Sequence, residues 1–234
     1  MADSAYISGI AFEGRAGAAV GPRHAAMVRV THWINTLSFL GLVVSGFGIL
    51  LAHPRFYWGE TGGVGTPSLF DLPLPFMLGG PSGWGRYLHF ESAWLCVLNG
   101  LLHVASGVAS GHFRKNLGVS RDELSWAAMR RAFARRVSSR YNPASYNVVQ
   151  RMVYLSVIFV WFPLMIWTGL AMSPAVTSVF PALVTVLGGH QCARTIHFFG
   201  AVLLVLFVVV HIAMVWRAGF WKRVGAMITG GTNE

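Results

Sequence analysis

The sequence predicts an all-α integral membrane protein, a four-helix up-and-down bundle with both termini in the cytoplasm. Hydrophobic residues make up 54% of the 234 residues and charged residues only 11%. That charged share is about half of the usual one, too little to cover a water-soluble surface. Four apolar segments are each long enough to cross a bilayer, which takes about 20 helical residues. Few Lys and Arg residues lie in the loops after the first and third spans, and this asymmetry predicts the orientation of the protein in the membrane.

The four predicted spans alternate with polar or turn-rich stretches, so residues 1–234 are expected to form a single membrane domain. The spans cover about 30–51, 87–108, 152–172 and 195–216, each close to the length that a bilayer requires. Pro163 is expected to kink the third span. Residues 1–26 include Asp3 and Glu13 and lack a continuous apolar core, so no cleaved signal peptide is expected.

The distribution of cations predicts which loops face the cytoplasm. Of the 18 Lys and Arg residues, only Arg55, Arg86 and Arg194 belong to the loops that follow the first and third spans. The others lie in the two terminal tails and the middle loop, at 109–151. Cytoplasmic loops carry the excess of cations, so the termini and the middle loop are expected inside and the other loops outside. The net charge of +10 therefore reflects topology rather than a nucleic acid partner.

The middle loop has a pattern that admits two interpretations. Ser120 followed by Glu123 fits a helix-capping box, and Leu124 and Phe133 belong to an apolar stripe beside the arginines. An amphipathic helix lying on anionic lipid would show this pattern. A solvated, positively charged loop would show it equally well.

Cysteine usage excludes several kinds of site. Cys96 and Cys192 are the only cysteines in the sequence, too few for a disulfide framework, a four-thiolate zinc site or a thiolate-bound iron–sulfur cluster. A CxxCH motif is also absent, which excludes covalently attached haem of the c type. A metal cofactor in this chain would have to rely on other ligands.

Histidines inside the predicted spans are the strongest functional signal. Ionisable side chains at membrane depth are costly, and each is by default a functional hypothesis. Five of the nine histidines lie in or at the edge of the spans: His32, His89, His103, His197 and His211. His197 and His211 are 14 residues apart, which places them on one helix face and about 21 Å apart along the axis. His89 and His103 repeat the interval.

This spacing favours two haem groups stacked across the bilayer. A non-covalent b-type haem between helices can take a neutral imidazole from each side, which leaves iron suited to electron transfer. Zinc or copper would need three or four ligands within a few ångströms, whereas these histidines are helical turns apart. His89 and His197 are expected at the same depth near the outer face. His211 lies near the inner face with His32 and His103 as candidate partners, and spacing alone leaves both open.

Short motifs in the four spans resemble one known family. The sequence is similar to the membrane cytochrome b subunits of bacterial formate dehydrogenases and nickel–iron hydrogenases, and to b-561-like and thiosulfate-reductase-type cytochromes b. The resemblance covers roughly residues 25–225. It is carried by Arg29-Val-Thr-His32-Trp33, Leu42-Val-Val-Ser-Gly46, Gly85-Arg-Tyr-Leu-His89, Tyr146-Asn147-x-x-Gln150-x-Met152, Ile196-His197 and Val210-His211.

The resemblance implies a ligand set and a quinone site. It implies that His32 and His211 hold the inner haem and that His89 and His197 hold the outer haem. His103 then stays an alternative ligand or a hydrogen-bonding residue beside the haem. The family also exchanges electrons with quinone beside the inner haem, which implies contacts from Asn147 and Gln150. Amides suit quinone carbonyls and hydroxyls, although Asn147 could equally cap the third helix.

Two features on the outer side each have a functional and a structural interpretation. Arg86 and Arg194 could pair with haem propionates or anchor the protein at lipid headgroups. The loop from 52 to 86 combines prolines and glycines with aromatic residues that could dock a partner protein or form an interfacial belt. These aromatic residues are Phe56, Tyr57, Trp58, Phe70 and Trp84.

These observations predict transmembrane electron transfer in the bacterial inner membrane, through two haem b groups, between a periplasmic oxidoreductase and the quinone pool. The resemblance implies a molybdopterin enzyme or a hydrogenase as partner, in some complexes through an iron–sulfur subunit. One alternative is a stand-alone quinone-linked oxidoreductase that acts on a small diffusible species such as superoxide. A transporter or structural anchor is a further alternative, but Glu91 is the one intramembrane carboxylate, near an edge, which argues against a cation carrier.

Overall fold

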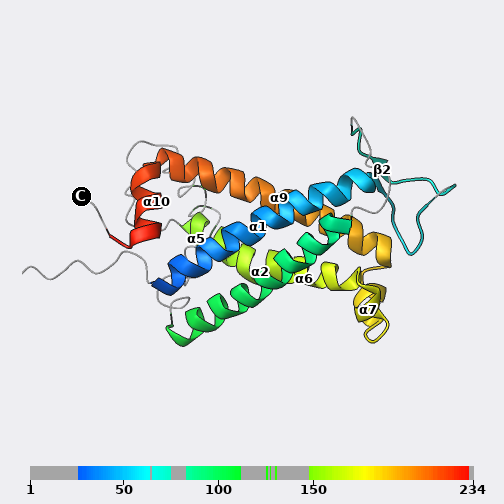
Figure 1. The fold of residues 1–234 in the computed structure, drawn as a ribbon, viewed down its shortest axis with the longest axis horizontal. Coiled ribbons are helices and arrows are strands. Elements are labelled where there is room, and N and C mark those ends of the chain that lie inside the picture. The colour runs from blue at the N-terminus through cyan, green and yellow to red at the C-terminus, as the bar shows by residue number, and fades with distance from the viewer. Residues whose placement is uncertain are drawn as a thin grey trace, which may run out of the picture.

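The computed structural model describes residues 26–63, 65–74, 83–111, 125, 127, 130 and 148–231. Four long helical rods dominate this part of the chain and run side by side in alternating directions (Figure 1). All four are long and apolar enough to cross a membrane, and they match the predicted spans to within a few residues. The rods are α1 (Ala26–Ala52), α2 (Gly83–Ala109), the third rod built from α5 (Val148–Ser156), η2 (Val157–Trp161) and α6 (Phe162–Ala171), and α9 (His190–Arg217).

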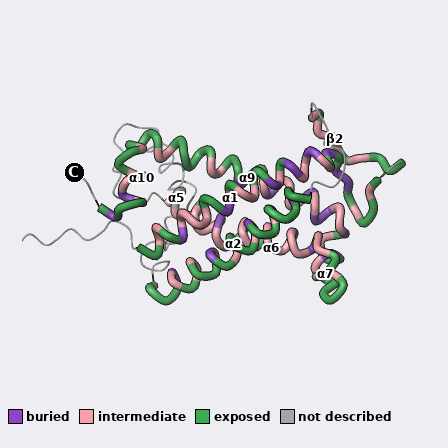
Figure 2. Tube along the Cα trace, in the orientation of Figure 1, coloured by how far each residue is buried: buried purple, intermediate pink, exposed green. Residues whose placement is uncertain are grey.

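The rods bury small polar residues and expose large apolar ones, as expected of helices solvated by lipid. On α1 the buried side chains include Thr31, Ser38 and Ser45, which recur every seven residues. Leu37 and Leu40 on the same helix are 66% and 59% exposed. Figure 2 shows exposed segments along the whole length of the rods. Helices in membranes associate through small residues that let their backbones approach, and this pattern follows that rule.

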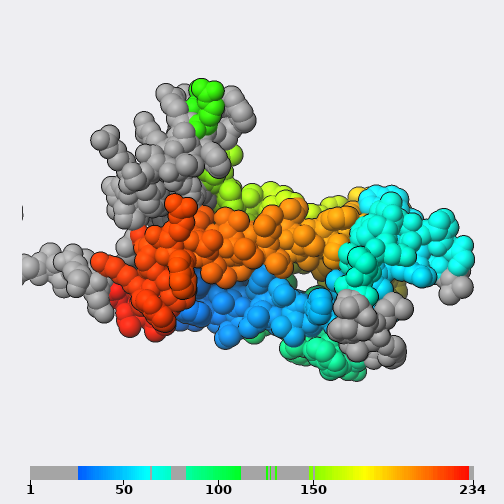
Figure 3. All heavy atoms as spheres, turned by 90° about the horizontal axis from the view of Figure 1, so that it is seen from above, coloured from blue at the N-terminus to red at the C-terminus, as the bar shows by residue number. Residues whose placement is uncertain are grey.

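Close approach between helices occurs in two pairs. α1 packs against α2, where a side chain on Gly41 would collide with the hydroxyl of Ser92. α6 packs against α9, where a Cβ on Gly200 would lie 2.7 Å from the sulfur of Met165. Between the two pairs, α1 and α9 lie side by side, with a narrow opening between them in the space-filling view (Figure 3).

The third rod departs from α-helical geometry just before Pro163. Val157–Trp161 form a π-helical segment, in which the amide of Phe162 donates to the carbonyl of Val157. Pro163 then occupies the first turn of α6. Proline has no N–H group and its ring clashes with the carbonyl four residues earlier, so a wider turn relieves that clash. The sequence predicted a kink at Pro163, and the structure has a π-helical segment just before this residue.

One end of the bundle carries a loop that folds back onto α9. β1 (Arg55–Phe56) and β2 (Phe70–Asp71) pair antiparallel. The ring of Phe56 stacks on Phe70 at 4.8 Å and contacts Phe198 of α9 at 4.5 Å. Thr195 donates a hydrogen bond to the carbonyl of Tyr57. Phe56 and Tyr57 are therefore buried in packing rather than displayed for docking, whereas Trp58 is 61% exposed.

Removing the Phe56 ring is expected to loosen this loop. Phe56 is 2% exposed, and truncating a buried phenylalanine typically costs about 3–5 kcal/mol. We expect Phe56→Ala to raise hydrogen exchange at the backbone amides of residues 55–71. Trp58→Ala is the matched control, because an exposed side chain contributes within about 0.5 kcal/mol. Unchanged exchange in Phe56→Ala would show that the aromatic packing does not hold the loop.

The structure contains short helices that the sequence analysis did not predict. α7 (Pro174–Thr177) and α8 (Ala182–Thr185) lie between the third rod and α9. α10 (Phe220–Thr229) follows α9 and crosses the opposite end of the bundle (Figure 1). The interfacial helix predicted in the middle loop falls on residues that, except for 125, 127 and 130, lie outside the described part of the chain.

Candidate functional site

Four of the predicted ligands come together as two pairs of imidazole rings. The rings of His89 on α2 and His197 on α9 have centroids 6.3 Å apart. The rings of His32 on α1 and His211 on α9 have centroids 6.5 Å apart. Two imidazoles on opposite sides of one metal ion, with metal–nitrogen bonds of about 2 Å, have centroids roughly 6 Å apart. Both pairs therefore have the separation that an axially ligated haem iron requires.

The two pairs lie at different depths in the bundle. His197 and His211 are 14 residues apart on one continuous helix, so the pairs are separated by about 21 Å along the axis. His89 lies in the second turn of α2, close to the end that carries β1 and β2. His32 lies in the second turn of α1, close to the α10 end. The arrangement has one pair near each end of the membrane-spanning region.

At the His89 and His197 pair, a hydroxyl group holds each ring in one orientation. Nδ1 of His89 lies 3.0 Å from the hydroxyl of Ser45, which itself donates to the carbonyl of Gly41 at 2.6 Å. The hydroxyl hydrogen is thus used, so Nδ1 carries a proton and donates it to Ser45. Nε2 is then the nitrogen with a lone pair for a metal.

His197 repeats this arrangement on the other helix pair. Nδ1 of His197 lies 2.8 Å from the hydroxyl of Thr168, which donates to the carbonyl of Leu164 at 2.8 Å. By the same argument Nδ1 of His197 is the donor, and Nε2 is the nitrogen with a lone pair available for a metal. Hydrogen bonds of this kind orient ligating histidines and raise their basicity. Both rings are therefore held with the proton on Nδ1 and the lone pair on Nε2.

Ser45 and Thr168 are candidate site residues that the sequence analysis missed. Each is followed by a glycine, and a Cβ on Gly46 or Gly169 would lie 3.7 Å or 3.6 Å from the Cε1 atom of the neighbouring histidine. α1 and α6 thus present the same hydroxyl–glycine dipeptide to a histidine of the next long helix. The sequence signal that could have identified them is this dipeptide, which occurs once in α1 and once in α6, each packed against a span with a candidate histidine.

Each ring of the His32 and His211 pair contacts one aromatic ring on its own helix. The ring of His32 meets Trp33 edge-on at 5.4 Å. The ring of His211 stacks with Phe207, one helical turn earlier, at 6.1 Å. His32 is half-buried and His211 is exposed.

His103, the alternative partner for His211, has both ring nitrogens in hydrogen bonds to other residues. Nδ1 lies 3.2 Å from the hydroxyl of Thr31, and Nε2 lies 2.9 Å from the hydroxyl of Tyr154 on α5. Thr31 donates to the carbonyl of Met27, so it accepts the Nδ1 proton, and Nε2 of His103 accepts from Tyr154. This arrangement uses His103 to join α1, α2 and α5.

Of the two predicted propionate contacts, Arg194 makes protein contacts of its own at the β1–β2 end, whereas Arg86 is exposed. Arg194 donates to the carbonyl of His53, and its guanidinium lies 4.9 Å from the centroid of the Phe56 ring. Burial, followed by the positive charges of Arg194 and Arg86, lowers the pKa of His53. The side chain of His53, just beyond α1, therefore favours its neutral form in this basic environment.

The two predicted quinone contacts are not described at the level of side chains. Asn147 lies outside the described residues, and for Gln150 the structure describes the backbone, within α5. Tyr154 follows Gln150 by four residues and so lies on the same face of α5. This face carries the hydroxyl that contacts His103.

Comparison with known proteins identifies related sequences over most of the chain. A family profile described as prokaryotic cytochrome b561 matches residues 23–230. A putative protein-methionine-sulfoxide reductase subunit YedZ1 of Azospira oryzae is 32% identical over 192 residues, which are 82% of this chain and 89% of that protein. A probable Ni/Fe-hydrogenase B-type cytochrome subunit of Cupriavidus necator is 26% identical over 226 residues, 88% of this chain and 84% of that protein.

Proposed function

The chain belongs to the prokaryotic cytochrome b561 family, and from this premise we propose that it carries electrons between the quinone pool and a periplasmic oxidoreductase through two haem b groups. Family membership makes it a multi-pass membrane electron-transfer protein that binds haem b. The number of haems, the ligands, the quinone and the partner are the proposal.

The observation that carries this proposal is the presence of two imidazole pairs with the same separation at two depths. His89 and His197 would hold one haem, and His32 and His211 would hold the other. Bound haem iron supplies one-electron transfer. At the first pair the protein contributes the orientation of each ring, through Ser45 and Thr168.

The proposed orientation follows from the charges. The α10 end would face the cytoplasm and the β1–β2 end the periplasm, because the cations outside the spans concentrate in the terminal tails and middle loop. The His32 and His211 pair would then be the inner site. The His89 and His197 pair would be the outer site, beside the loop at 53–74.

A partner protein is supported by the names of both relatives, each of which is called a subunit. Those names include a methionine-sulfoxide reductase and a nickel–iron hydrogenase, so a redox partner of either type fits the resemblance. The folded loop at the β1–β2 end is the proposed docking site, with Trp58 as its exposed aromatic side chain.

The proposed quinone site lies near the inner pair, where α5 begins. Asn147 and Gln150 remain the proposed contacts, and the hydroxyl of Tyr154 on the same helix face is an additional candidate. Its hydrogen bond to Nε2 of His103 would allow Tyr154 to pass a proton when a quinol hydroxyl donates to it. The amide side chains would orient the quinone oxygens.

Spectroscopy on the purified chain in lipid nanodiscs tests the proposal. We expect two haems per chain by haem quantification, reduction of haem by decylubiquinol or menadiol, and reoxidation of the reduced protein by the corresponding quinone. A single haem, or haems that exchange electrons with neither probe, would contradict it. Crosslinking in native membranes should capture a periplasmic redox protein at Trp58, and a chain that reduces quinone with superoxide alone would instead support the stand-alone alternative.

A further inference from the structure

The last helix turns across the end of the membrane bundle. α9 ends at Arg217, and α10 begins at Phe220 after a turn at Gly219, whose φ of +92° is a conformation that glycine adopts readily. Figure 1 shows α10 crossing the ends of the long helices instead of continuing α9. Because α9 is a membrane span, α10 lies at the level where the bilayer meets water.

Side chains of α1 bind the carboxyl end of α10 on both sides of His32. The indole N–H of Trp33 donates to the carbonyl of Met227 at 3.1 Å. The guanidinium of Arg29 donates to the carbonyl of Ile228 at 2.8 Å. Carbonyls in the last turn of a helix lack intrahelical partners and form the negative end of its dipole, so an indole and a cation both suit them. The position of α10 is thus coupled to the segment of α1 that carries His32.

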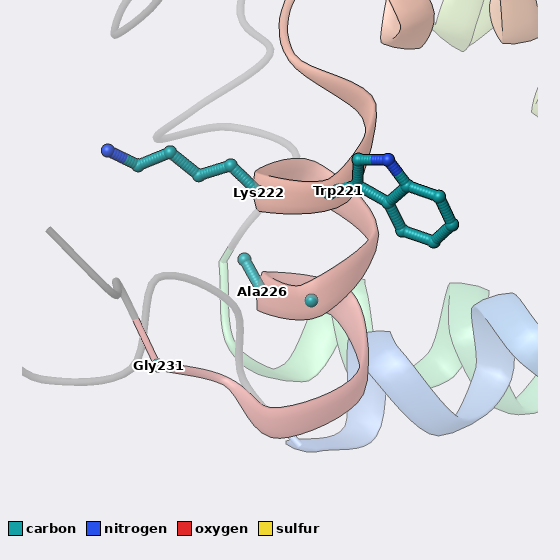
Figure 4. A pocket seen from close by; sticks show the side chains of 5 residues that line it. Trp221, Lys222, Ala226 and Gly231 are labelled. Atoms are coloured by element: carbon teal, nitrogen blue, oxygen red, sulfur yellow. The ribbon is translucent and has the colours of Figure 1, made fainter.

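α10 also carries exposed apolar side chains on one face and cations on other faces. Trp221 and Ile228 are 84% and 61% exposed and lie seven residues apart, on one face. Figure 4 shows Trp221 and Lys222 extending from the helix in different directions. A cavity of about 280 Å³ is lined by Trp221, Lys222, Gly225, Ala226 and Gly231. Residues 217–231 include three cations, Arg217, Lys222 and Arg223, and no acidic residue.

We propose that α10 binds anionic phospholipid at its end of the bundle and that this binding holds α1 in place at His32. Exposed tryptophan beside lysine and arginine, on a helix parallel to the bilayer surface, is typical of interfacial membrane binding. Trp221 and Ile228 enter the headgroup–acyl boundary, and Lys222 and Arg223 pair with phosphodiester groups. The lipid-binding part of the proposal depends only on the observations on α10. The coupling to the inner haem rests on the proposed ligand role of His32.

Hydrogen exchange of the full chain in nanodiscs tests the lipid-binding part. We expect the amides of residues 220–229 to exchange more slowly in phosphatidylcholine containing phosphatidylglycerol than in phosphatidylcholine alone, by about fivefold for each cation engaged. The double variant Lys222→Gln/Arg223→Gln should lose this difference. Arg55→Gln, at the other end and paired with Asp71 at 3.5 Å, should keep it. Equal exchange in both lipids, or a difference that survives the double variant, would overturn the proposal.

The redox potential of the inner haem tests the coupling. Phosphatidylglycerol should shift the potential of that haem and leave the other unchanged, and the double variant should remove the shift. A lipid effect on α10 exchange without any shift would overturn the coupling alone. Absence of haem would contradict the proposed function while the exchange result still stands. If α10 were protected in native membranes and not in anionic nanodiscs, a partner protein would occupy this face and the lipid proposal would be wrong.

Discussion

Replacing His32 with alanine is expected to reduce the haem content from two to one per chain, whereas His103→Ala should leave both haems bound. The His32 ring lies 6.5 Å from His211, the separation of two axial ligands on one iron. His103 instead uses both ring nitrogens in hydrogen bonds to Thr31 and Tyr154. Haem quantification and a reduced-minus-oxidised spectrum of each purified variant measure this difference.

Two further variants separate ligand loss from general damage to the inner site. His211→Ala should remove the same spectral component as His32→Ala, and the double variant should lose nothing more. Tyr154→Phe removes the hydroxyl that contacts Nε2 of His103 and should keep both haems. Loss of one haem in His103→Ala, with both retained in His32→Ala, would overturn the assignment of the inner ligands.

The membrane architecture was predictable because a bilayer imposes a simple rule on sequence. Each span must be apolar for about 20 residues and satisfy its own backbone hydrogen bonds, so composition and length alone locate it. α1 and α9 extend a few residues beyond the predicted spans, because helices continue into the interface where hydropathy no longer marks them. The disturbance at Pro163 was predictable for a similarly local reason, the missing N–H group.

The pairing of histidines was only partly predictable from the residues themselves. The interval of 14 residues places His197 and His211 on one face of a single helix. Whether His32 or His103 approaches His211 depends instead on how α1 and α2 rotate against each other. That rotation is set by contacts between small residues, such as Gly41 against Ser92, which no periodicity of one helix reveals. The family resemblance supplied the choice that spacing left open.

Other features escaped prediction because one residue type has several roles at a membrane surface. Phe56 and Tyr57 belong to the loop between α1 and α2 and are buried, whereas aromatic residues in such loops commonly form an interfacial belt. Ser45 and Thr168 donate to carbonyls of their own helix, as serine and threonine in membrane helices often do, and only the structure adds the histidine contact. α10 is ten residues long, too short for its periodicity to stand out beside a span.

Replacing His197 with alanine is expected to abolish electron transfer across the protein while leaving the inner haem reducible by quinol. His197 lies 6.3 Å from His89, and neither ring has another imidazole partner among the described pairs of rings. Without the outer haem, an electron on the inner haem would have no carrier across the distance of about 21 Å between the two histidine pairs. Proteoliposomes loaded with decylubiquinol and supplied with external ferricyanide, a membrane-impermeant acceptor, measure this transfer. Persistent reduction of ferricyanide at the parent rate would contradict the two-haem pathway.

Thr168→Val is the matched variant that keeps the ligand and removes its support. Valine preserves the shape of threonine but cannot accept a hydrogen bond from Nδ1 of His197, which lies 2.8 Å from the threonine hydroxyl oxygen. Loss of such an orienting hydrogen bond typically weakens metal binding by about 10–100-fold. We therefore expect outer haem occupancy to depend on haem supply in Thr168→Val, with electron transfer recovering at saturation, whereas His197→Ala should not recover at any supply. Outer haem occupancy in Thr168→Val equal to that of the parent at limiting haem supply would mean that the hydroxyl contributes no more than packing.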